Sequence, residues 1–419
     1  MKNKNSNNEI WLAAGLRTPF VKEGKDLSGI SAIDMSVAVI NRMKRTLNVP
    51  PNYVAWGTVL PNLEFSNIAR DIVLESELPD ETVAFSTTMA CSTSLLSTLQ
   101  LASIITDDEI GLSGGVESMS NVQLGLSNNT SNWIKSLPKI KSVLGKLKWG
   151  LRIFKFRLYI PPGVNRVTGK SMGQHAEITA QRLGIQREAQ DKLALKSHQN
   201  YFKAKRKGFY EDLVFPAFNV LEDLIPRENT SLDKLKTLKP VFDRTSKGTL
   251  TAGNSTLFTD GAAGVWMAGK NRINDLKTPY KAKLIDWELA AVNIEEEGIL
   301  MSPSFAIPRL LERNDLTYND IDLWEIHEAF ASQVLSTIKN LEDKNHLQKV
   351  GTKTNFGAFP TDKLNINGSS IAIGHPFGAT GARILSQTVK QISQMGTNKK
   401  AIVSVCADGG LGAVVLVQS

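Results

Sequence analysis

Short apolar runs alternate along the chain with longer stretches whose apolar residues recur every three or four positions. The short runs predict strands at residues 10–14, 82–85, 110–113, 284–287, 323–326, 401–406 and 412–417. The longer stretches predict helices at 32–46, 92–105, 305–313 and 328–340, and a further one that follows the Gly-rich 366–381 and ends near 394. This alternation, punctuated by Gly-rich turns, is typical of an α/β protein. Because a similar succession occurs twice, we expect two α/β halves of similar plan.

A region of long irregular stretches separates the two successions and predicts an insertion. We expect an N-terminal half made of residues 1–120 and 249–280, an inserted loop domain at 121–248, and a C-terminal half at 281–419. A chain of 419 residues is long enough for two or three packed units. An insertion of this length usually carries function or partner contacts rather than core.

Composition narrows the class of protein. No apolar run reaches the roughly 20 residues that span a bilayer, and the polar start of the chain has no signal-peptide pattern, so we expect a cytoplasmic protein. Two cysteines without a CxxC spacing cannot form a disulfide framework or a Cys-rich metal site. Each cysteine is therefore considered singly, and the alternative to a reactive thiol is a small buried side chain.

Cys91 lies between a predicted strand and a predicted helix. A thiol at the start of a helix is close to free N–H groups and the positive end of the helix dipole, which favour the nucleophilic thiolate. His375 lies in a Gly-rich turn, 374–381, where the backbone can approach a ligand closely. An imidazole beside a thiol can remove its proton and stabilise the anion.

Cys406 and His327 also lie where a predicted strand ends. Cys406 follows a buried-looking strand and precedes the glycines of residues 409–412, so a second thiol could carry a proton there. His327 begins the tetrad His-Glu-Ala-Phe, where a strand meets a helix. Taken alone, His327 would be interpreted as part of an ordinary helix start.

Together these constellations resemble the thiolase family, in the same order and over nearly the whole chain. Further matches are Arg-Thr-Pro-Phe at 17–20, Gly-Gly-Val-Glu-Ser-Met-Ser at 114–120, Ser-Met-Gly at 171–173 with Ala-Glu at 176–177, and Thr-Ala-Gly-Asn-Ser at 251–255 before Asp-Gly-Ala at 260–262. The resemblance implies a layered α-β-α-β-α fold with an inserted loop domain. It also implies a catalytic set in which Cys91 is acylated, His375 activates Cys91, Cys406 exchanges a proton with the acyl carbon, and His327 helps to hold the oxyanion.

The resemblance extends to substrate and partners. It implies that coenzyme A and acyl-CoA are substrates, that no cofactor or metal is needed, and that the protein is a homodimer or larger. Residues predicted to contact substrate are Asn254, Ser255 and Thr256, along the pantetheine arm, with Gly374 and Gly409. Two departures from the family pattern are the flanking residues Ser92 to Ser94 and the acidic Asp408, whose carboxylate would oppose an oxyanion if it pointed inward.

The motifs favour one branch of the family. His327, with Gly-His-Pro-Phe-Gly-Ala-Thr-Gly at 374–381, resembles the 3-ketoacyl-CoA thiolases of fatty-acid β-oxidation, the β subunits of trifunctional complexes, which work with a hydratase/dehydrogenase α subunit. The alternatives are a biosynthetic acetoacetyl-CoA thiolase, which generally has Asn at the position of His327, and a condensing synthase, which generally lacks the paired cysteines. A non-enzymatic lipid- or partner-binding scaffold is the remaining alternative.

The net charge of +8 is concentrated in the insertion. Residues 118–176 hold ten Lys or Arg and no Asp or Glu, so the rest of the chain is close to neutral. Within 134–158, apolar and basic residues alternate at helical spacing, which predicts one or two basic amphipathic helices, with Gly145 and Gly150 weakening a single one. The segment could be a solvated face, a peripheral helix at an inner membrane surface, or a contact for coenzyme A phosphates or a partner subunit. Nucleic acid is not expected, because no binding motif accompanies the charge.

Overall fold

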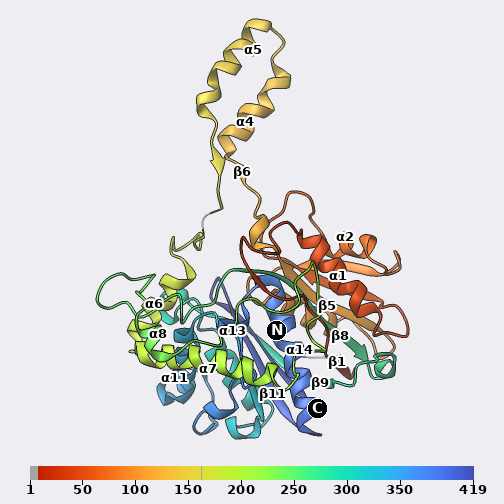
Figure 1. Ribbon diagram of the computed structural model, residues 1–419, viewed down its shortest axis with the longest axis vertical. Coiled ribbons are helices and arrows are strands. Elements are labelled where there is room, and N and C mark those ends of the chain that lie inside the picture. The colour runs from red at the N-terminus through yellow and green to blue at the C-terminus, as the bar shows by residue number, and fades with distance from the viewer. Residues whose placement is uncertain (1–7, 162) are drawn as a thin grey trace.

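The structure is a computed structural model that describes residues 8–161 and 163–419. Its centre is a mixed sheet in which ten of the strands in the described residues join (Figure 1). The strand order is β10 (Leu323–Ile326), β11 (Lys400–Ala407), β12 (Leu411–Gln418), β9 (Lys281–Ala291), β1 (Ile10–Ala13), β8 (Thr259–Gly269), β5 (Ile110–Glu117), β3 (Tyr53–Gly57) and β4 (Val83–Thr87), with β2 (Val21–Lys22) paired to β8.

The N-terminal half is built on β3, β4 and β5, which are parallel, with β8 antiparallel to β5. Its outer face is covered by α1 (Ala32–Lys44) and α2 (Ile68–Glu75). Helix α1 begins at Ser31, whose side chain forms a reciprocal capping box with Asp34. Its buried residues Met35, Val39 and Met43 recur every four positions, so one face of the helix packs on the sheet.

The C-terminal half repeats this plan. β10 and β11 are parallel, and β12 and β9 extend the sheet in antiparallel pairs. Its outer face is covered by α10 (Pro303–Arg313), α11 (Ala331–Glu342) and α12 (Lys344–Val350). Helix α11 starts three residues later than the expected 328–340, because residues 327–330 form an extended turn that ends at the N-cap Phe330.

Two buried helices, α3 (Thr93–Ala102) and α14 (Thr380–Met395), lie side by side between the two sets of strands. The five predicted layers are therefore present, in the order outer helices, strands, central helices, strands and outer helices. The halves are joined more closely than the sequence indicated, because β1 pairs with β8 on one side and with β9 on the other. The predicted α/β class is confirmed.

One part of the inserted region packs against the C-terminal half. Helices α6 (Met172–Arg182), α7 (Arg187–Lys205) and α8 (Leu232–Lys236) lie beside α11 and α13 (Ser370–Ile373) (Figure 1). Tyr201 and Ala204 of α7 are buried in the main core cluster. This part of the insertion therefore contributes to the core rather than only to the surface. The division of the chain near 120, 248 and 280 stays a prediction.

The other part, which we call the arm (residues 125–159), projects away from the body (Figure 1). Its two chain segments pair as β6 (Gly125–Leu126) and β7 (Leu158–Tyr159), and beyond them α4 (Asn128–Ser136) and α5 (Val143–Gly150) form a helical hairpin. The helices are held together by Trp133 and Trp149, whose rings stack with centroids 4.3 Å apart. Each indole N–H donates to the backbone oxygen of the other residue.

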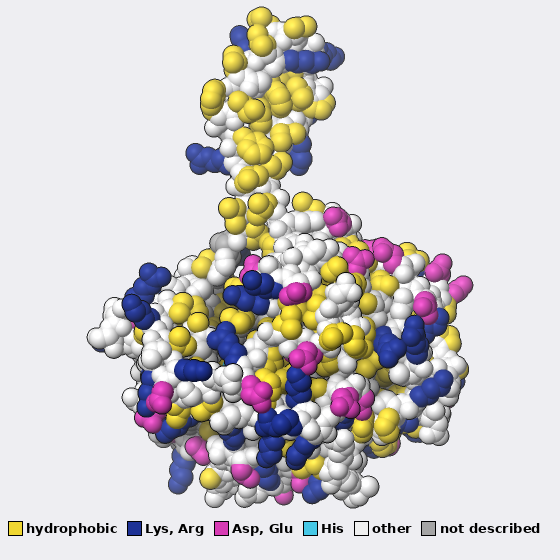
Figure 2. All heavy atoms as spheres, viewed as in Figure 1, with side chains coloured by type: hydrophobic (Ala, Val, Ile, Leu, Met, Phe, Trp, Pro, Cys, Tyr) yellow, Lys and Arg dark blue, Asp and Glu magenta, His cyan; other side chains and the backbone are white. Residues whose placement is uncertain are grey.

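The apolar side chains of the arm are exposed. Figure 2 shows hydrophobic side chains gathered along the arm with basic ones among them. Val143 is 85% exposed, Leu144 65% and Phe154 90%. In the predicted segment 134–158 the structure forms one α-helix, α5, whereas α4 ends at Ser136 and lies mostly before it. The chain turns between the two helices at Ile140 to Ser142 rather than at Gly145. In the part of the chain that is described, no helix is long and apolar enough to cross a membrane.

Candidate active site

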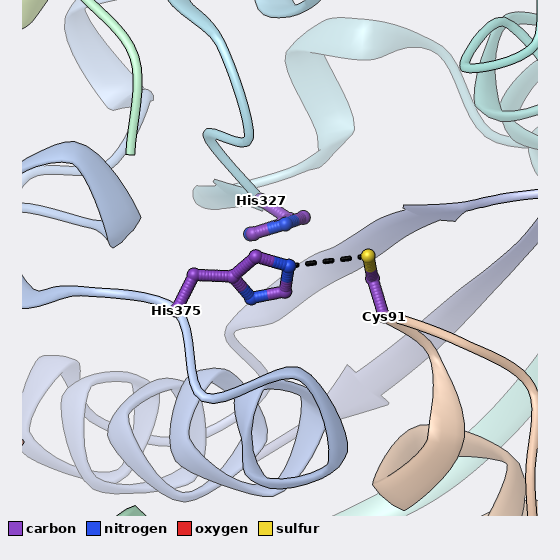
Figure 3. A group of neighbouring side chains, drawn as sticks. All are labelled: Cys91, His327 and His375. Carbon is purple, nitrogen blue, oxygen red and sulfur yellow. Dashed lines mark hydrogen bonds between the residues drawn. The ribbon is translucent and has the colours of Figure 1, made fainter. Parts of the chain in front are cut away.

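Cys91 and His375 meet where the two halves face each other. Cys91 Sγ lies 3.1 Å from His375 Nε2 (Figure 3). Cys91 follows β4 in a tight turn, in which Ala90 has the left-handed φ of 45°, a strained conformation for a residue with a Cβ. The turn ends as Ser92 caps α3, so the thiol lies at the start of that helix as predicted. His375 comes from the turn between α13 and α14.

The tautomer of His375 follows from Thr380. The Thr380 hydroxyl donates its one hydrogen to the backbone oxygen of Pro376 at 3.1 Å. It lies 2.6 Å from His375 Nδ1, so it can only accept from that nitrogen. With the hydroxyl hydrogen on Pro376 O, His375 carries its proton on Nδ1, and its bare Nε2 faces the thiol. This is the arrangement of a base for Cys91.

Both partners are neutral in the free protein. Burial raises the pKa of Cys91 to about 12, and the negative charges of Asp408 and Glu117 act in the same direction. Burial and the Arg383 charge lower the pKa of His375 to about 3. In the resting state, burial therefore outweighs the backbone N–H groups that favour the anion.

Cys406 lies at the end of β11, close to the same turn. The Ser92 hydroxyl donates to the backbone oxygen of Val405 at 2.9 Å, which ties the nucleophile turn to the strand that carries Cys406. Burial, and next the nearby Cys91, raise the pKa of Cys406 well above its ordinary value. Both cysteines are free thiols.

His327 lies over the ring of His375, with ring centroids 4.2 Å apart (Figure 3). Its Nδ1 lies 2.8 Å from Ser370 Oγ, and its fully buried Nε2 has no hydrogen-bond partner among residues 8–161 and 163–419. One donor atom each from Cys91, His327 and His375 fall within 4.8 Å of one another. Such a set could also ligate a soft metal ion such as zinc, although the family resemblance implies none.

Asp408 is turned toward the inserted region. Its Oδ1 accepts from Asn165 Nδ2 at 2.7 Å and from the Gly409 N–H at 2.6 Å. Its charge still reaches Cys91, since it contributes to the raised pKa of the thiol. Asn165 lies just beyond the base of the arm, so one hydrogen bond links that region to the turn after Cys406.

Several supporting residues were not assigned from sequence. Glu117 is fully buried and accepts from Thr58 and from the backbone N–H groups of Val59, Leu60 and Gly378, so it joins strand ends to the His375 turn. Glu117 and Thr380 lie within the family-like motifs at 114–120 and 374–381, and only this position in a motif could have indicated their roles. Ser370 and Arg383 carried no such signal beyond their closeness to His375 in the sequence.

The residues predicted to contact substrate have different environments. Residues 255–258 run beside the catalytic turns, because Ser255 bridges to Phe330 and Phe258 bridges to His375. The Asn254 side chain is fully buried and bonded to Asp191, to Thr249 O and to Thr251 N, so it holds its own loop.

The other predicted contacts lie at turns. Thr256 Oγ1 donates to Ser370 O. Gly374 and Gly409 have φ of 106° and 87°, which favour glycine. The contact of these residues with pantetheine stays a prediction.

Comparison with known proteins agrees with this geometry. Family models described as thiolase, N-terminal domain, and thiolase, C-terminal domain, match residues 10–271 and 278–419. A 3-ketoacyl-CoA thiolase of Photobacterium profundum is 36% identical, over 98% of this chain and 97% of its own. The solved human mitochondrial 3-ketoacyl-CoA thiolase in complex with CoA has a TM-score of 0.78 at 28% identity, with 98% of each chain covered. The acetyl-CoA acetyltransferase of Bacillus anthracis has a TM-score of 0.79 at 26% identity, over 99% of this chain and 100% of its own.

Proposed function

Since the chain belongs to the thiolase family, we propose that it cleaves a 3-ketoacyl-CoA with coenzyme A, through an acyl group carried on Cys91. The products are acetyl-CoA and an acyl-CoA shorter by two carbons, as in fatty-acid β-oxidation. The observation that carries the proposal is the 3.1 Å contact between Cys91 Sγ and the bare Nε2 of His375.

In the first half-reaction, His375 Nε2 takes the thiol proton as Cys91 Sγ attacks the keto carbon. The bond between C2 and C3 of the substrate breaks, and its electron pair passes to C2. Cys406 protonates C2, which releases acetyl-CoA and leaves a thioester on Cys91. Burial raises the pKa values of both thiols, so neither thiol is ionised before the reaction begins. Cys91 loses its proton as it attacks, and Cys406 loses its proton as C2 accepts it.

In the second half-reaction, the thiol of coenzyme A attacks the thioester carbonyl. The Cys406 thiolate accepts the proton of the incoming thiol, Cys91 leaves, and His375 returns its proton to Cys91. Both cysteines and the imidazole regain their starting states. His327, with its Nε2 unpaired beside His375, is suited to stabilise the oxyanion that develops.

A thiolysis assay with C4 and C16 3-ketoacyl-CoA substrates tests the activity and separates it from a biosynthetic acetoacetyl-CoA thiolase. Incubation with a ketoacyl-CoA in the absence of coenzyme A should acylate the peptide that contains Cys91, as measured by mass spectrometry. No turnover of either substrate would favour a binding scaffold, and an acyl group found only on another peptide would overturn the role of Cys91.

We also propose that the protein is a dimer. Among residues 8–161 and 163–419, β4 ends the sheet with an unpaired edge, and Val83 is 54% exposed. An edge strand of this kind suits pairing with a second copy. Light scattering in solution should give twice the mass of the chain. A monomeric mass at micromolar concentration would contradict this.

The arm is proposed as a peripheral contact with an anionic membrane surface. Exposed apolar side chains lie among basic ones on a projecting hairpin, and this combination suits burial at a lipid interface. A hydratase/dehydrogenase α subunit is the alternative occupant.

A further inference from the structure

Behind His327 lies a buried polar chain that the proposed mechanism does not use. Ser370 Oγ, on α13, lies 2.8 Å from His327 Nδ1 and 2.6 Å from Arg383 Nη2, on α14. All three side chains are at most 2% exposed. The direction of these two hydrogen bonds decides which nitrogen of His327 carries the proton.

The guanidinium fixes the first direction. Arginine has only hydrogens to give, so Ser370 Oγ accepts from Arg383. The pKa of Arg383 is lowered to about 10, mainly by burial, which leaves it protonated near neutral pH. The nearby carboxyl groups of Glu325 and Glu328 act to raise its pKa and so favour the charged form.

The serine fixes the second direction. Its single hydrogen has one acceptor in the described parts of the chain, which is Nδ1 of His327. If Nδ1 carried the proton instead, Ser370 Oγ would accept twice, its own buried hydrogen would have no partner, and the lone pair of His327 Nε2 would be unpaired as well. His327 is neutral, because burial, His375 and Arg383 all lower its pKa. The bare nitrogen is therefore Nδ1, and the N–H is Nε2.

We propose that Ser370 and Arg383 are positioning residues that hold His327 as the Nε2–H tautomer, so that it donates a hydrogen bond to the carbonyl oxygen of the acyl-CoA. The catalytic role of this donor rests on the function proposed above. Two imidazoles 4.2 Å apart thus have opposite tautomers. Thr380 accepts from His375 and leaves an acceptor at Nε2, whereas Ser370 donates to His327 and leaves a donor there.

The tautomers can be observed without turnover. In protein labelled with ¹⁵N-histidine, the two ring nitrogens of a neutral imidazole resonate far apart, and their coupling to ring protons shows which one is protonated. His327→Asn assigns the His327 signals. We expect His327 protonated at Nε2 and His375 at Nδ1. In Ser370→Ala, the Nε2–H signal of His327 should give way to a mixture of tautomers.

Kinetics supply the second readout. Ser370→Ala should lower kcat about tenfold or more with little change in KM, since one oxyanion donor is worth about 10²–10³-fold and only its orientation is lost. The matched control is Ser369→Ala, which removes the neighbouring buried hydroxyl that has no hydrogen-bond partner within the described residues. Ser369→Ala should keep the wild-type tautomer and a kcat within about twofold. Arg383→Lys, which retains a charged donor, should keep more Nε2–H than Arg383→Met.

The outcomes separate the two proposals. A His327 proton on Nδ1 in the wild type, or an Nε2–H signal and kcat unchanged in Ser370→Ala, would overturn the positioning role. Absence of thiolysis with the predicted tautomers in place would overturn the proposed function and leave the tautomer assignment standing.

Discussion

His375 Nε2 lies 3.1 Å from Cys91 Sγ, although 284 positions separate the two residues in the chain. Cys91 comes from the N-terminal half and His375 from the C-terminal half, so neither half holds the pair alone. Both groups are neutral at rest, since burial raises the pKa of the thiol and lowers that of the imidazole. Activation of the nucleophile therefore has to accompany the arrival of substrate.

The neutral thiol gives a testable pH dependence. The pKa of Cys91, raised to about 12, means that alkylation by iodoacetamide should be slow at pH 7 and rise steadily into the alkaline range. Asp408→Asn removes a negative charge that raises this pKa, so the thiolate fraction and the alkylation rate at pH 8 should increase several-fold. Peptide mass spectrometry would separate Cys91 from Cys406. The exposed Asp362→Asn is the control, and an equal rate in both variants would rule out the influence of Asp408.

The division of labour between the cysteines can be tested by isotope exchange. Cys406→Ala should still be acylated at Cys91 by an acyl-CoA, because the Cys91 and His375 pair is intact. Exchange of the acetyl-CoA α-protons into deuterated water should fall by at least about 10²-fold, the usual contribution of a positioned acid or base. Normal exchange in this variant would assign the proton transfer to another group.

Stability should depend strongly on one buried ion pair. Arg17 donates to both carboxylate oxygens of Asp223, which also accepts from Tyr201, and the pair is almost fully buried. Asp223→Ala leaves an uncompensated buried guanidinium and should lower the free energy of unfolding by about 3–5 kcal/mol.

The control is Glu228, whose ion pair with Arg206 is exposed. Glu228→Ala should change the free energy of unfolding by at most about 1 kcal/mol. Urea unfolding of both variants measures the difference, and equal effects would contradict the assignment.

The arm should determine association rather than chemistry. Replacement of four basic residues with Glu should abolish sedimentation with anionic liposomes, because the charge attraction is reversed, and leave turnover of a short substrate near normal. The residues are Lys139, Lys141, Lys146 and Lys148. Wild-type binding should weaken with salt, over a screening length of about 8 Å near physiological ionic strength.

A control variant carries four exposed lysines of the body changed to Glu, namely Lys22, Lys25, Lys236 and Lys247. Unchanged liposome binding by the arm variant, with loss of an α-subunit partner in pull-down, would assign the arm to that partner. Collapsed turnover would instead indicate a contact with coenzyme A.

Motifs and periodicity predicted the layered fold, and the structure brings the candidate residues Cys91, His375 and His327 together. Cys91 and His375 could be singled out because each lies in a short turn between a strand or helix and the next helix. The charge state of Cys91 could not be predicted, because burial depends on every element packed around the turn. The roles of Thr380 and Ser370 could not be predicted either, because the role of a hydroxyl depends on which atoms it hydrogen-bonds in the folded structure. In the arm, periodicity predicted helices, but only the tertiary structure shows that their apolar side chains remain exposed.

The pairing of β6 with β7 has a consequence for how the arm could be gained or lost. These two strands bring the ends of residues 125–159 side by side, at the roughly 4.8 Å spacing of adjacent strands. A two-residue hairpin turn could close that gap, and the arm has its own stacked tryptophan pair to hold it together. Excision of residues 127–157 should therefore leave the register of the central sheet unchanged, because β6 and β7 form a separate two-stranded sheet.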